Sequence, residues 1–258
     1  AGRYLPEFRK IRLLNKDFIK LCLNSDLSSE ITLQPLKRFN LDAAIIFSDI
    51  LMVPFGLGQE VNFIKNQGPI LSDFNLSKFL CSDKNDFLNK LKPVYTAIKK
   101  TRKKLNYSKS LIAFIGAPWT LAVYMLGVKK NKNIIDFNKL KKKENELKII
   151  IDKLSEYLCV HIENQYNAGA DIVQIFDSWA GLIPNQKLYD YCYKPNKKIV
   201  EFCKRKKIPV ICFPKGINKN YLQFAETVNP NCLSLDYEID PIWARDNLKN
   251  FCLQGGMN

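Results

Sequence analysis

Short apolar runs alternate six times with longer amphipathic segments, and this alternation restricts the fold more than any other feature of the sequence. Each run has the length of one strand and ends at a polar residue or a turn. Repeated strand–helix units imply a parallel sheet, and this many favour a (β/α)8 barrel. Because six strands do not close such a barrel, we expect an α/β fold, a (β/α)8 TIM barrel lacking its first strand and its C-terminal strand. The predicted strands are residues 43–47, 111–115, 171–176, 209–213, 232–235 and 251–256.

Apolar residues at helical spacing predict the segments between these strands to be helices. Residues 61–71 predict a hairpin that turns at residues 66–68. Residues 128–148 are rich in Lys and Asn and are expected to form a mobile excursion. We therefore expect a single domain over residues 1–258. The predicted helices are residues 86–105, a helix that starts near 118 and carries Tyr124, and residues 149–165, 189–204, 221–226 and 241–250.

The chain of 258 residues carries 40 Lys and Arg against 25 Asp and Glu, a net charge of +15. Such a balance suits nucleic acid, an acidic membrane surface or an anionic substrate. The lysine runs at 99–104, 139–143 and 197–207 fall in helical or linker stretches and not after strands, so we interpret them as solvated faces. A nucleic-acid partner is not expected. No window of 18 apolar residues lacks a charge, so no membrane span is expected either.

Eight cysteines are scattered without a C-x-x-C pair, and the chain has one histidine, His161. This pattern favours reduced thiols in an intracellular compartment and predicts no metal site. Cys159, Cys212, Cys232 and Cys252 lie in or beside apolar runs and are expected to behave as small hydrophobic residues. His161 falls on a predicted helix far from any strand end, so we interpret it as structural.

Polar residues that follow buried strands are the first candidates for chemistry, because ligands bind at that edge of a parallel sheet. Asp49 follows the first strand, and its alternative role is to cap the next helix. Ser178 follows the third strand but has no His or Lys base beside it, so it is a hydrogen-bond donor and not a nucleophile. Tyr124 is either a site residue or a packed core aromatic.

Three arginines open the chain. Pro6 discourages helix at the residue before it, so Arg3 is expected on a loop. Arg9 and Arg12 are three residues apart and could share one face of a helical turn.

Five longer segments then occur in order, AGRYLPEFR, ITLQPLKRFNLDAAIIFSDILMVPFGLG, GAPWTLAVYM, AGADIVQIFDSWAG and LDYEIDP with LQGGMN. Together they resemble the uroporphyrinogen decarboxylase family over nearly the whole chain, except residues 128–148. The resemblance implies a lyase of haem and chlorophyll synthesis that needs neither cofactor nor metal. It implies removal of carbon dioxide from the four acetate arms of uroporphyrinogen III to give coproporphyrinogen III, in a homodimer of (β/α)8 barrels. The expected location is the cytoplasm or a plastid, and the plastid rests only on the missing N-terminus, where a transit segment would lie.

The resemblance also assigns roles to residues. Asp49 would accept the pyrrole N–H bonds and stabilise the cation that forms when a pyrrole carbon is protonated. Arg3 and Arg12, with the backbone at Ala1, would hold the acid arms of the substrate. Tyr124 would hydrogen-bond the reacting acetate or orient Asp49, and Ser178 would hold another acid arm.

Two departures from the family pattern matter. The family opens with Arg-Gln-Ala-Gly-Arg whereas this chain begins at the Ala, and the family's later Gly-His-Gly segment is absent. We therefore expect a fragment or a processed form, inactive or unstable unless the native gene product is longer. The alternatives are a basic nucleic-acid-binding module and a corrinoid-linked methyltransferase of the same superfamily. The latter would need zinc held by His and Cys, a set that the predicted strand ends do not offer.

Overall fold

The computed structural model describes residues 2–64, 68–131, 134–136, 140 and 143–256. These residues form two compact units, residues 1–114 with 161–173 (unit 1) and residues 115–160 with 174–258 (unit 2). The unit boundaries fall inside β4, β7 and α9, so each of these elements has residues in both units.

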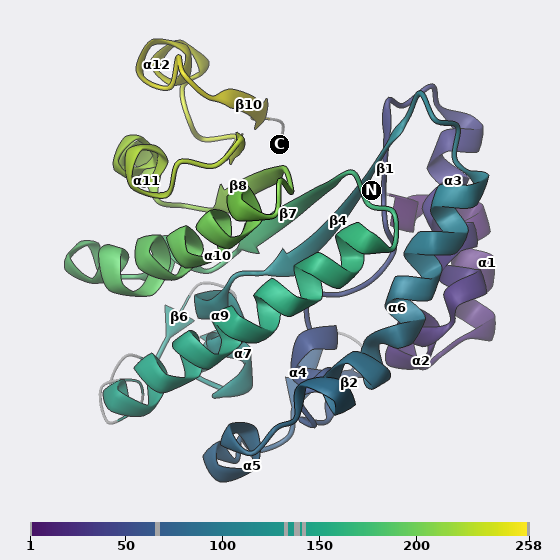
Figure 1. The fold of residues 1–258 in the computed structure, drawn as a ribbon, viewed down its shortest axis with the longest axis horizontal. Coiled ribbons are helices and arrows are strands. Elements are labelled where there is room, and N and C mark those ends of the chain that lie inside the picture. The colour runs from purple at the N-terminus through teal and green to yellow at the C-terminus, as the bar shows by residue number, and fades with distance from the viewer. Residues whose placement is uncertain (1, 65–67, 132–133, 137–139, 141–142, 257–258) are drawn as a thin grey trace. The chain divides into compact units, whose positions relative to one another are not determined.

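Unit 1 holds the first strands and most of the N-terminal helices (Figure 1). Its helices are η1 (Gly2–Tyr4), α1 (Pro6–Leu14), α2 (Phe18–Leu23), α3 (Ser25–Arg38), α4 (Met52–Gly56), α5 (Leu76–Leu80) and α6 (Lys84–Lys104). Its strands are β1 (Ala43–Ile45), β2 (Val61–Ile64), β3 (Gly68–Leu71) and the start of β4 (Ser110–Gly116).

Unit 2 continues the alternation of strands and helices. Its helices are α7 (Pro118–Met125), most of α9 (Glu144–Asn167), η2 (Ala180–Leu182), η3 (Asn185–Lys187), the π-helical turn η4 (Tyr189–Tyr193), α10 (Lys194–Arg205), η5 (Asn218–Asn220), α11 (Tyr221–Val228) and α12 (Pro241–Asn247). Its strands are β5 (Lys129–Asn131), β6 (Ile134–Ile135), the end of β7 (Ile172–Asp177), β8 (Val210–Pro214), β9 (Cys232–Leu235) and β10 (Cys252–Gly255).

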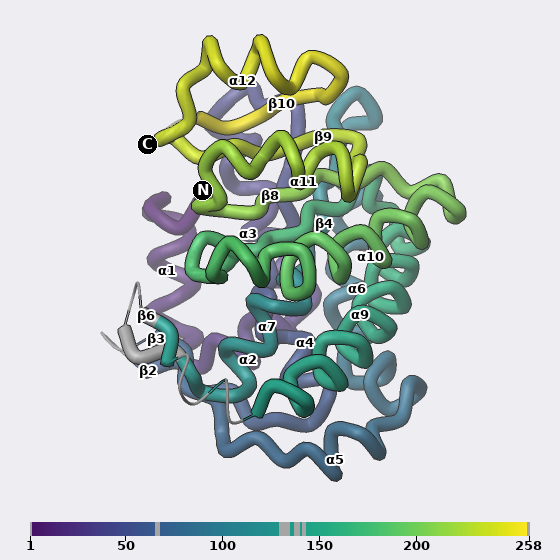
Figure 2. Tube along the Cα trace, turned by 90° about the vertical axis from the view of Figure 1, so that its left-hand side faces the viewer, coloured from purple at the N-terminus to yellow at the C-terminus, as the bar shows by residue number. Residues whose placement is uncertain are grey.

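The main sheet has six strands in the order β1-β4-β7-β8-β9-β10. The pairs β1–β4, β8–β9 and β9–β10 are parallel, and a helix follows each strand before the next one begins. The α/β class and the strand–helix repeat of a (β/α)8 barrel with six strands present are therefore confirmed. In Figure 2, β9 and β10 run side by side with α12 against them.

Apolar spacing explains how helix α6 forms. Phe87, Leu91, Val94 and Ile98 recur every three or four residues and are all buried, so one face of α6 is a continuous apolar stripe. The side chain of Asp83 accepts hydrogen bonds from the backbone N–H groups of the first turn and starts the helix. The stripe anchors α6 in the core of unit 1, where it packs beside α3 (Figure 1).

Strand β1 is shorter and more exposed than the sequence predicted. It ends at Ile45, whose side chain is 49% exposed, so the expectation of a strand over 43–47 buried on both faces was wrong. The backbone N–H of Phe47 donates to Thr32 Oγ1 at 2.8 Å, which takes the chain out of the ladder. Among the described strands, β1 pairs in the main sheet with β4 alone.

Several helices differ from the predicted ones. α9 begins at Glu144 instead of 149, and α12 ends at Asn247 instead of 250. Residues 189–193 form a π-helical turn before α10, so the predicted helix 189–204 has two parts. The sequence analysis missed the short helices α2 and α5, because apolar periodicity is a weak signal over five or six residues.

The Lys- and Asn-rich segment 128–148 contains secondary structure. β5 and β6 pair antiparallel within it, and α9 begins at Glu144. Most of the predicted lysine run 139–143 lies outside the described residues, as do residues 66 and 67 of the predicted hairpin turn, whose strands β2 and β3 do pair antiparallel.

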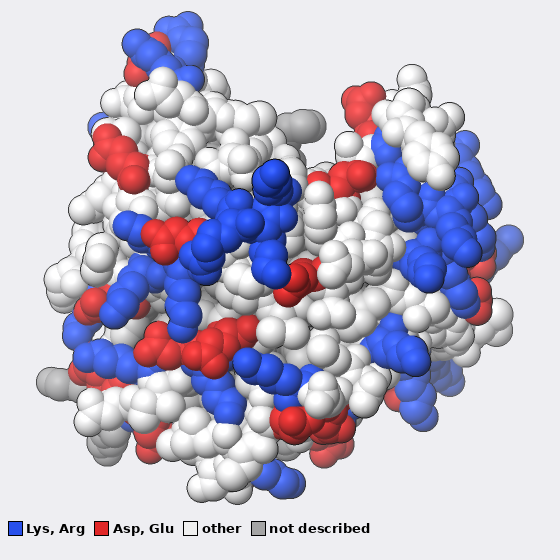
Figure 3. All heavy atoms as spheres, in the orientation of Figure 1, with Lys and Arg blue, Asp and Glu red and all other residues white. Residues whose placement is uncertain are grey.

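Charged side chains cover the outside of the described helices. On the face drawn in Figure 3, Lys and Arg lie among Asp and Glu. Lys187 Nζ lies 2.6 Å from Glu144 Oε1, and Lys198 pairs with Glu156 at 3.8 Å. Such pairing supports solvated faces. No helix among the described residues is long and apolar enough to cross a membrane.

Candidate active site

The exit of β1 positions the first candidate residue. The N–H of Ile46 donates to Ile112 O at 2.9 Å, the last ladder bond before the chain turns away. The chain then passes through Ser48 and Asp49 and enters α4 at Met52. Asp49 thus lies at the carboxyl end of a parallel strand, where the sequence placed it.

Asp49 does not cap α4, because the N-cap residue is Leu51 and that helix has no side-chain cap. Instead, Asp49 Oδ1 accepts a hydrogen bond of 3.0 Å from the backbone N–H of Leu51, an Asx turn that fixes the carboxylate. The side chain is half-buried. Burial raises the pKa of Asp49 above its usual value, against the opposing effects of the Leu51 N–H and the Arg3 charge.

Arg3 and Arg12 both lie over the ring of Phe18, with their guanidinium carbons 5.4 Å and 5.6 Å from its centroid. Arg3 is in the 3-10 turn η1 and not on a loop, so that expectation was wrong. The turn packs closely on α3, since a Cβ on Gly2 would lie 2.9 Å from Pro35 Cγ.

Arg12 is held in place by its own backbone. Its Nη1 donates to Lys16 O at 2.7 Å and also to Asn15 O, the carbonyls that follow α1. These bonds leave its other guanidinium nitrogens available to an anion. Arg9, the other arginine of α1, is exposed and does not share the Phe18 contact.

Cys22, a residue that sequence reasoning missed as a neighbour of the site, shows how close the three candidates of unit 1 lie. Burial raises the pKa of this thiol first, the negative charge of Asp49 raises it further, and the charges of Arg3 and Arg12 lower it. The charges of Asp49, Asp17, Arg3 and Arg12 therefore all act on one buried thiol of α2. The apolar pattern of α2 is only six residues long, too short to predict the helix that brings Cys22 close to these charges.

Tyr124 and Ser178 belong to unit 2. Tyr124 is half-buried on α7, and its ring meets that of Trp179 at a centroid distance of 5.9 Å and an angle of 62°. Ser178, also half-buried, is in the turn that follows β7, directly before Trp179. The tyrosine and the serine turn are thus neighbours within unit 2. Arg3, Arg12 and Asp49 are grouped within unit 1, and Ala1 lies outside the described residues.

The sequence analysis also missed the buried acid Asp177, which anchors the Ser178 turn. Thr120 Oγ1 donates to Asp177 Oδ1 at 2.7 Å, and Asn196 Nδ2 donates to Asp177 Oδ2 at 3.3 Å. The N–H of Trp179 in turn donates to Thr120 Oγ1 at 3.2 Å. Burial raises the pKa of Asp177 to about 6 although these hydrogen bonds favour the charged form. The sequence signal that could have identified Asp177 is a carboxylate at the end of the apolar run IVQIFD.

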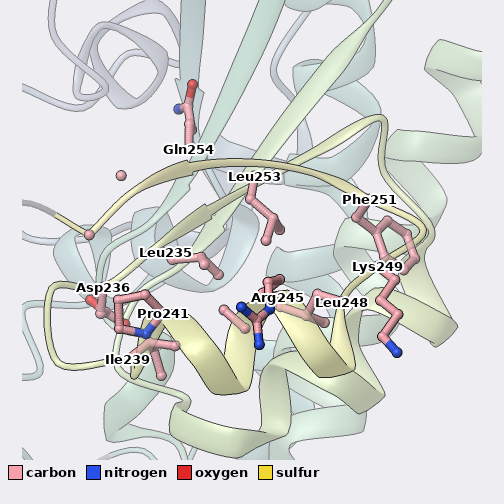
Figure 4. Close-up of a pocket in the computed structure, with 13 residues that line it drawn as sticks. Leu235, Asp236, Ile239, Pro241, Arg245, Leu248, Lys249, Phe251, Leu253 and Gln254 are labelled. Carbon is pink, nitrogen blue, oxygen red and sulfur yellow. The ribbon is translucent and has the colours of Figure 1, made fainter.

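A cavity of about 500 Å³ lies between α12 and strands β9 and β10 (Figure 4). Leu235, Ala244, Leu248 and Leu253 form its apolar wall, and Arg245 is at its side. None of the described candidate residues lines this cavity. The cavity therefore contributes none of its lining residues to the candidate site.

His161 has the structural role that the sequence predicted. It is buried on α9, and its Nδ1 shares a hydrogen bond of 2.9 Å with the hydroxyl of Tyr95. Burial lowers its pKa to about 3. Among the described residues, no cluster of three or more His, Cys, Asp or Glu is placed to hold a metal ion.

Known proteins resemble this chain in sequence. Three similar relatives are named uroporphyrinogen decarboxylase, from Orientia tsutsugamushi strain Ikeda (46% identity over 198 residues), Rickettsia bellii (45% over 194) and Mesorhizobium japonicum (39% over 197). The matches cover 75%, 72% and 74% of this chain and 57%, 55% and 56% of the relatives. The chain thus spans somewhat more than half the length of the curated relatives it matches.

One solved structure, a methyltransferase from Methanosarcina mazei, has a similar fold with a TM-score of 0.67. The similarity covers 97% of this chain and 84% of the methyltransferase at 15% sequence identity, so it shows the fold alone. The family model described as uroporphyrinogen decarboxylase (URO-D) matches residues 1–258. The chain therefore belongs to the uroporphyrinogen decarboxylase family.

Proposed function

We propose that the native gene product decarboxylates the four acetate arms of uroporphyrinogen III to give coproporphyrinogen III, a carboxy-lyase reaction of porphyrin and haem synthesis. The observation that carries the proposal is the group in unit 1: a fixed, half-buried carboxylate, Asp49, at a strand end, with Arg3 and Arg12 gathered around the same position. This combination suits a substrate with pyrrole N–H donors at its centre and carboxylates around its edge.

The reaction needs an electron sink, because carbon dioxide leaves its bonding electrons behind. Protonating a pyrrole carbon next to the acetate arm makes the ring a cation that can accept them. Loss of carbon dioxide then neutralises the ring, a second proton converts the exocyclic methylene to methyl, and the ring carbon releases the first proton to restore the pyrrole. No electrons enter or leave overall, so this route is balanced without a redox partner.

Asp49 is the proposed stabiliser of that cation. Its carboxylate oxygen Oδ1 is fixed by Leu51, and among the described residues no donor reaches Oδ2. The free oxygen can accept pyrrole N–H bonds. A fixed, half-buried carboxylate stabilises a developing cation more than a carboxylate in water does, because neither its side chain nor surrounding water has to reorient during the reaction.

Arg3 and Arg12 are the proposed holders of the acid arms. A guanidinium binds a carboxylate with two parallel hydrogen bonds, and stacking on Phe18 limits how far either head can move. Tyr124 is proposed to hydrogen-bond the reacting acetate or to orient Asp49, and Ser178 to hold another acid arm, with the backbone at Ala1 beside the arginines. The net charge of +15 favours approach of a polyanion.

We further propose that residues 1–258 act as one barrel domain, that the protein pairs as a homodimer, and that it uses no cofactor. A cytoplasmic location is supported by the bacterial origin of the relatives, which gives no support to a plastid. The alternatives are less favoured. The relatives are named decarboxylases. Against the zinc-dependent methyltransferase, His161 is buried and its ring shares a hydrogen bond with Tyr95. Against the nucleic-acid-binding module, the surface lysine Lys198 pairs with Glu156.

Incubating the native gene product with uroporphyrinogen III in the absence of oxygen tests the proposal. Chromatography of the oxidised porphyrins should show species with seven, six and five carboxylates before coproporphyrin appears. Recovery of all the substrate unchanged, under conditions in which the protein is folded, would overturn it.

A further inference from the structure

Two cysteines face each other across strands β9 and β10. Cys252 and Cys232 are direct partners in the parallel register, and three more pairs extend the ladder toward Gly255. Gly255 fixes the end of this register, because its φ is +96° and a Cβ there would lie 2.6 Å from Leu235 O. The two cysteines cannot slip past each other without breaking the ladder.

Their side chains lie on the same face of the sheet. Side chains alternate along a strand, and direct partners on neighbouring strands point the same way. Figure 4 shows Leu253 pointing toward α12 and Gln254 pointing to the other face. Cys252, two residues before Gln254, therefore points away from the α12 cavity together with Cys232.

The two thiols are within reach of each other. Neighbouring strands lie about 4.8 Å apart, and disulfides span Cα–Cα distances of roughly 4.4 to 6.8 Å. Burial raises the pKa of Cys232 to about 12, and a hydrogen bond that its thiol donates to the Cys252 sulfur acts in the same direction. The register therefore meets the main geometric requirement for a disulfide.

The two thiols differ in access to solvent. Cys232 is 7% exposed, whereas Cys252 is exposed, so the expectation that Cys252 behaves as a small buried hydrophobic residue was wrong. It is on β10, which pairs with β9. No other two cysteines in the described part of the chain are register partners on adjacent strands.

We propose that Cys232 and Cys252 form an oxidative modification site, at which a peroxide converts the exposed and the buried thiol into an intrachain disulfide. First, the Cys252 thiolate attacks hydrogen peroxide. An S–O bond forms, the O–O bond breaks, and water leaves to give a sulfenic acid. The Cys232 sulfur then attacks the Cys252 sulfur, an S–S bond forms, and the S–O bond breaks with loss of a second water. Two thiols are oxidised and one peroxide is reduced to two waters.

The second step requires Cys232 as a thiolate. The thiolate is the nucleophile, and the raised pKa of Cys232 keeps it mostly protonated near neutral pH. The thiolate fraction rises about tenfold per pH unit below the pKa. Attack by Cys232 should therefore be faster at pH 8 than at pH 7.

Peptide mapping tests this proposal without any assay of enzymatic activity. The chain is treated with hydrogen peroxide, free thiols are blocked with iodoacetamide, and trypsin is added without reductant. Cleavage after Lys219, Arg245 and Lys249 places Cys232 alone in peptide 220–245 and Cys252 alone in the peptide that begins at Asn250. A linked pair of these peptides, two hydrogens lighter than their sum, is the expected product.

Matched variants make the outcome decisive. Cys232→Ser should leave Cys252 to proceed to sulfinic acid, and Cys252→Ser should leave Cys232 reduced. Cys81, exposed at the end of α5, is the control for an exposed thiol without a register partner and should form no intrachain link. Recovery of Cys252 as sulfinic acid in the unmodified sequence, with Cys232 still reduced, would overturn the proposal, as would peroxide treatment that leaves both reduced.

Discussion

Thr120 Oγ1 donates a 2.7 Å hydrogen bond to the buried carboxylate of Asp177 and accepts one from the N–H of Trp179. One hydroxyl thus joins the start of α7, the end of β7 and the turn that carries Ser178. The position of this turn depends on an acid whose pKa is about 6, so it depends on pH.

We expect Asp177 to make stability depend on pH with a definite sign. Its pKa is 3.8 in the unfolded chain and about 6 in the fold, so the folded state binds more protons in between. The stability it contributes is fully present below pH 3.8 and lost as pH rises through 6. Relative to Asp177→Asn, the wild type should lose about 2 kcal/mol of unfolding free energy in urea titrations from pH 4 to pH 7. A difference that does not vary with pH would contradict this.

His161 should not titrate near neutral pH. Its pKa is 6.5 in the unfolded chain and about 3 in the fold, so the stability it contributes is present above 6.5 and lost as pH falls toward 3. It is the only histidine in the chain, so its ring proton resonances need no assignment by mutation. Proton NMR should show them unchanged from pH 8 to pH 5. A titration midpoint near 6.5 would show that the ring is hydrated.

Arg3→Lys and Arg12→Lys should weaken substrate binding more than they slow turnover. Lys keeps the charge but loses the two-pronged contact with a carboxylate and the guanidinium contact with the Phe18 ring. We expect KM for uroporphyrinogen III to rise about tenfold in each variant, equivalent to about 1.4 kcal/mol. Arg9→Lys, on the exposed part of α1, is the control and should leave KM unchanged. Equal effects in all three variants would mean that only overall charge matters.

Much of the fold could be predicted because strands and long helices have strong periodic signals. β9 occupies the predicted residues, and α6 differs from its prediction by one or two residues at each end. Both have apolar patterns that agree with their length. The end of β1 could not be predicted, since it depends on a hydrogen bond that the Phe47 N–H donates to Thr32, fifteen residues earlier in the chain.

The candidate site was only partly visible in the sequence. Asp49 was named from its position after a strand, and its place at the strand end was found as predicted. Its grouping with Arg3 and Arg12 depends on Phe18 and Cys22, which a short helix brings to them from elsewhere in the sequence. Asp177 was overlooked because its role comes from partners on α7 and α10 that no local pattern reveals.

The most direct test of the account is the initial rate of uroporphyrinogen III decarboxylation by the Asp49→Asn variant of the native gene product. The amide keeps the size of the side chain and an oxygen for the Leu51 N–H but removes the charge that would stabilise the protonated pyrrole. We expect kcat to fall by at least about a hundredfold, the scale of losing one fixed electrostatic group. Asp42→Asn, an exposed acid just before β1, should retain full activity. Turnover by Asp49→Asn equal to that of the wild type, with both variants folded, would contradict the account.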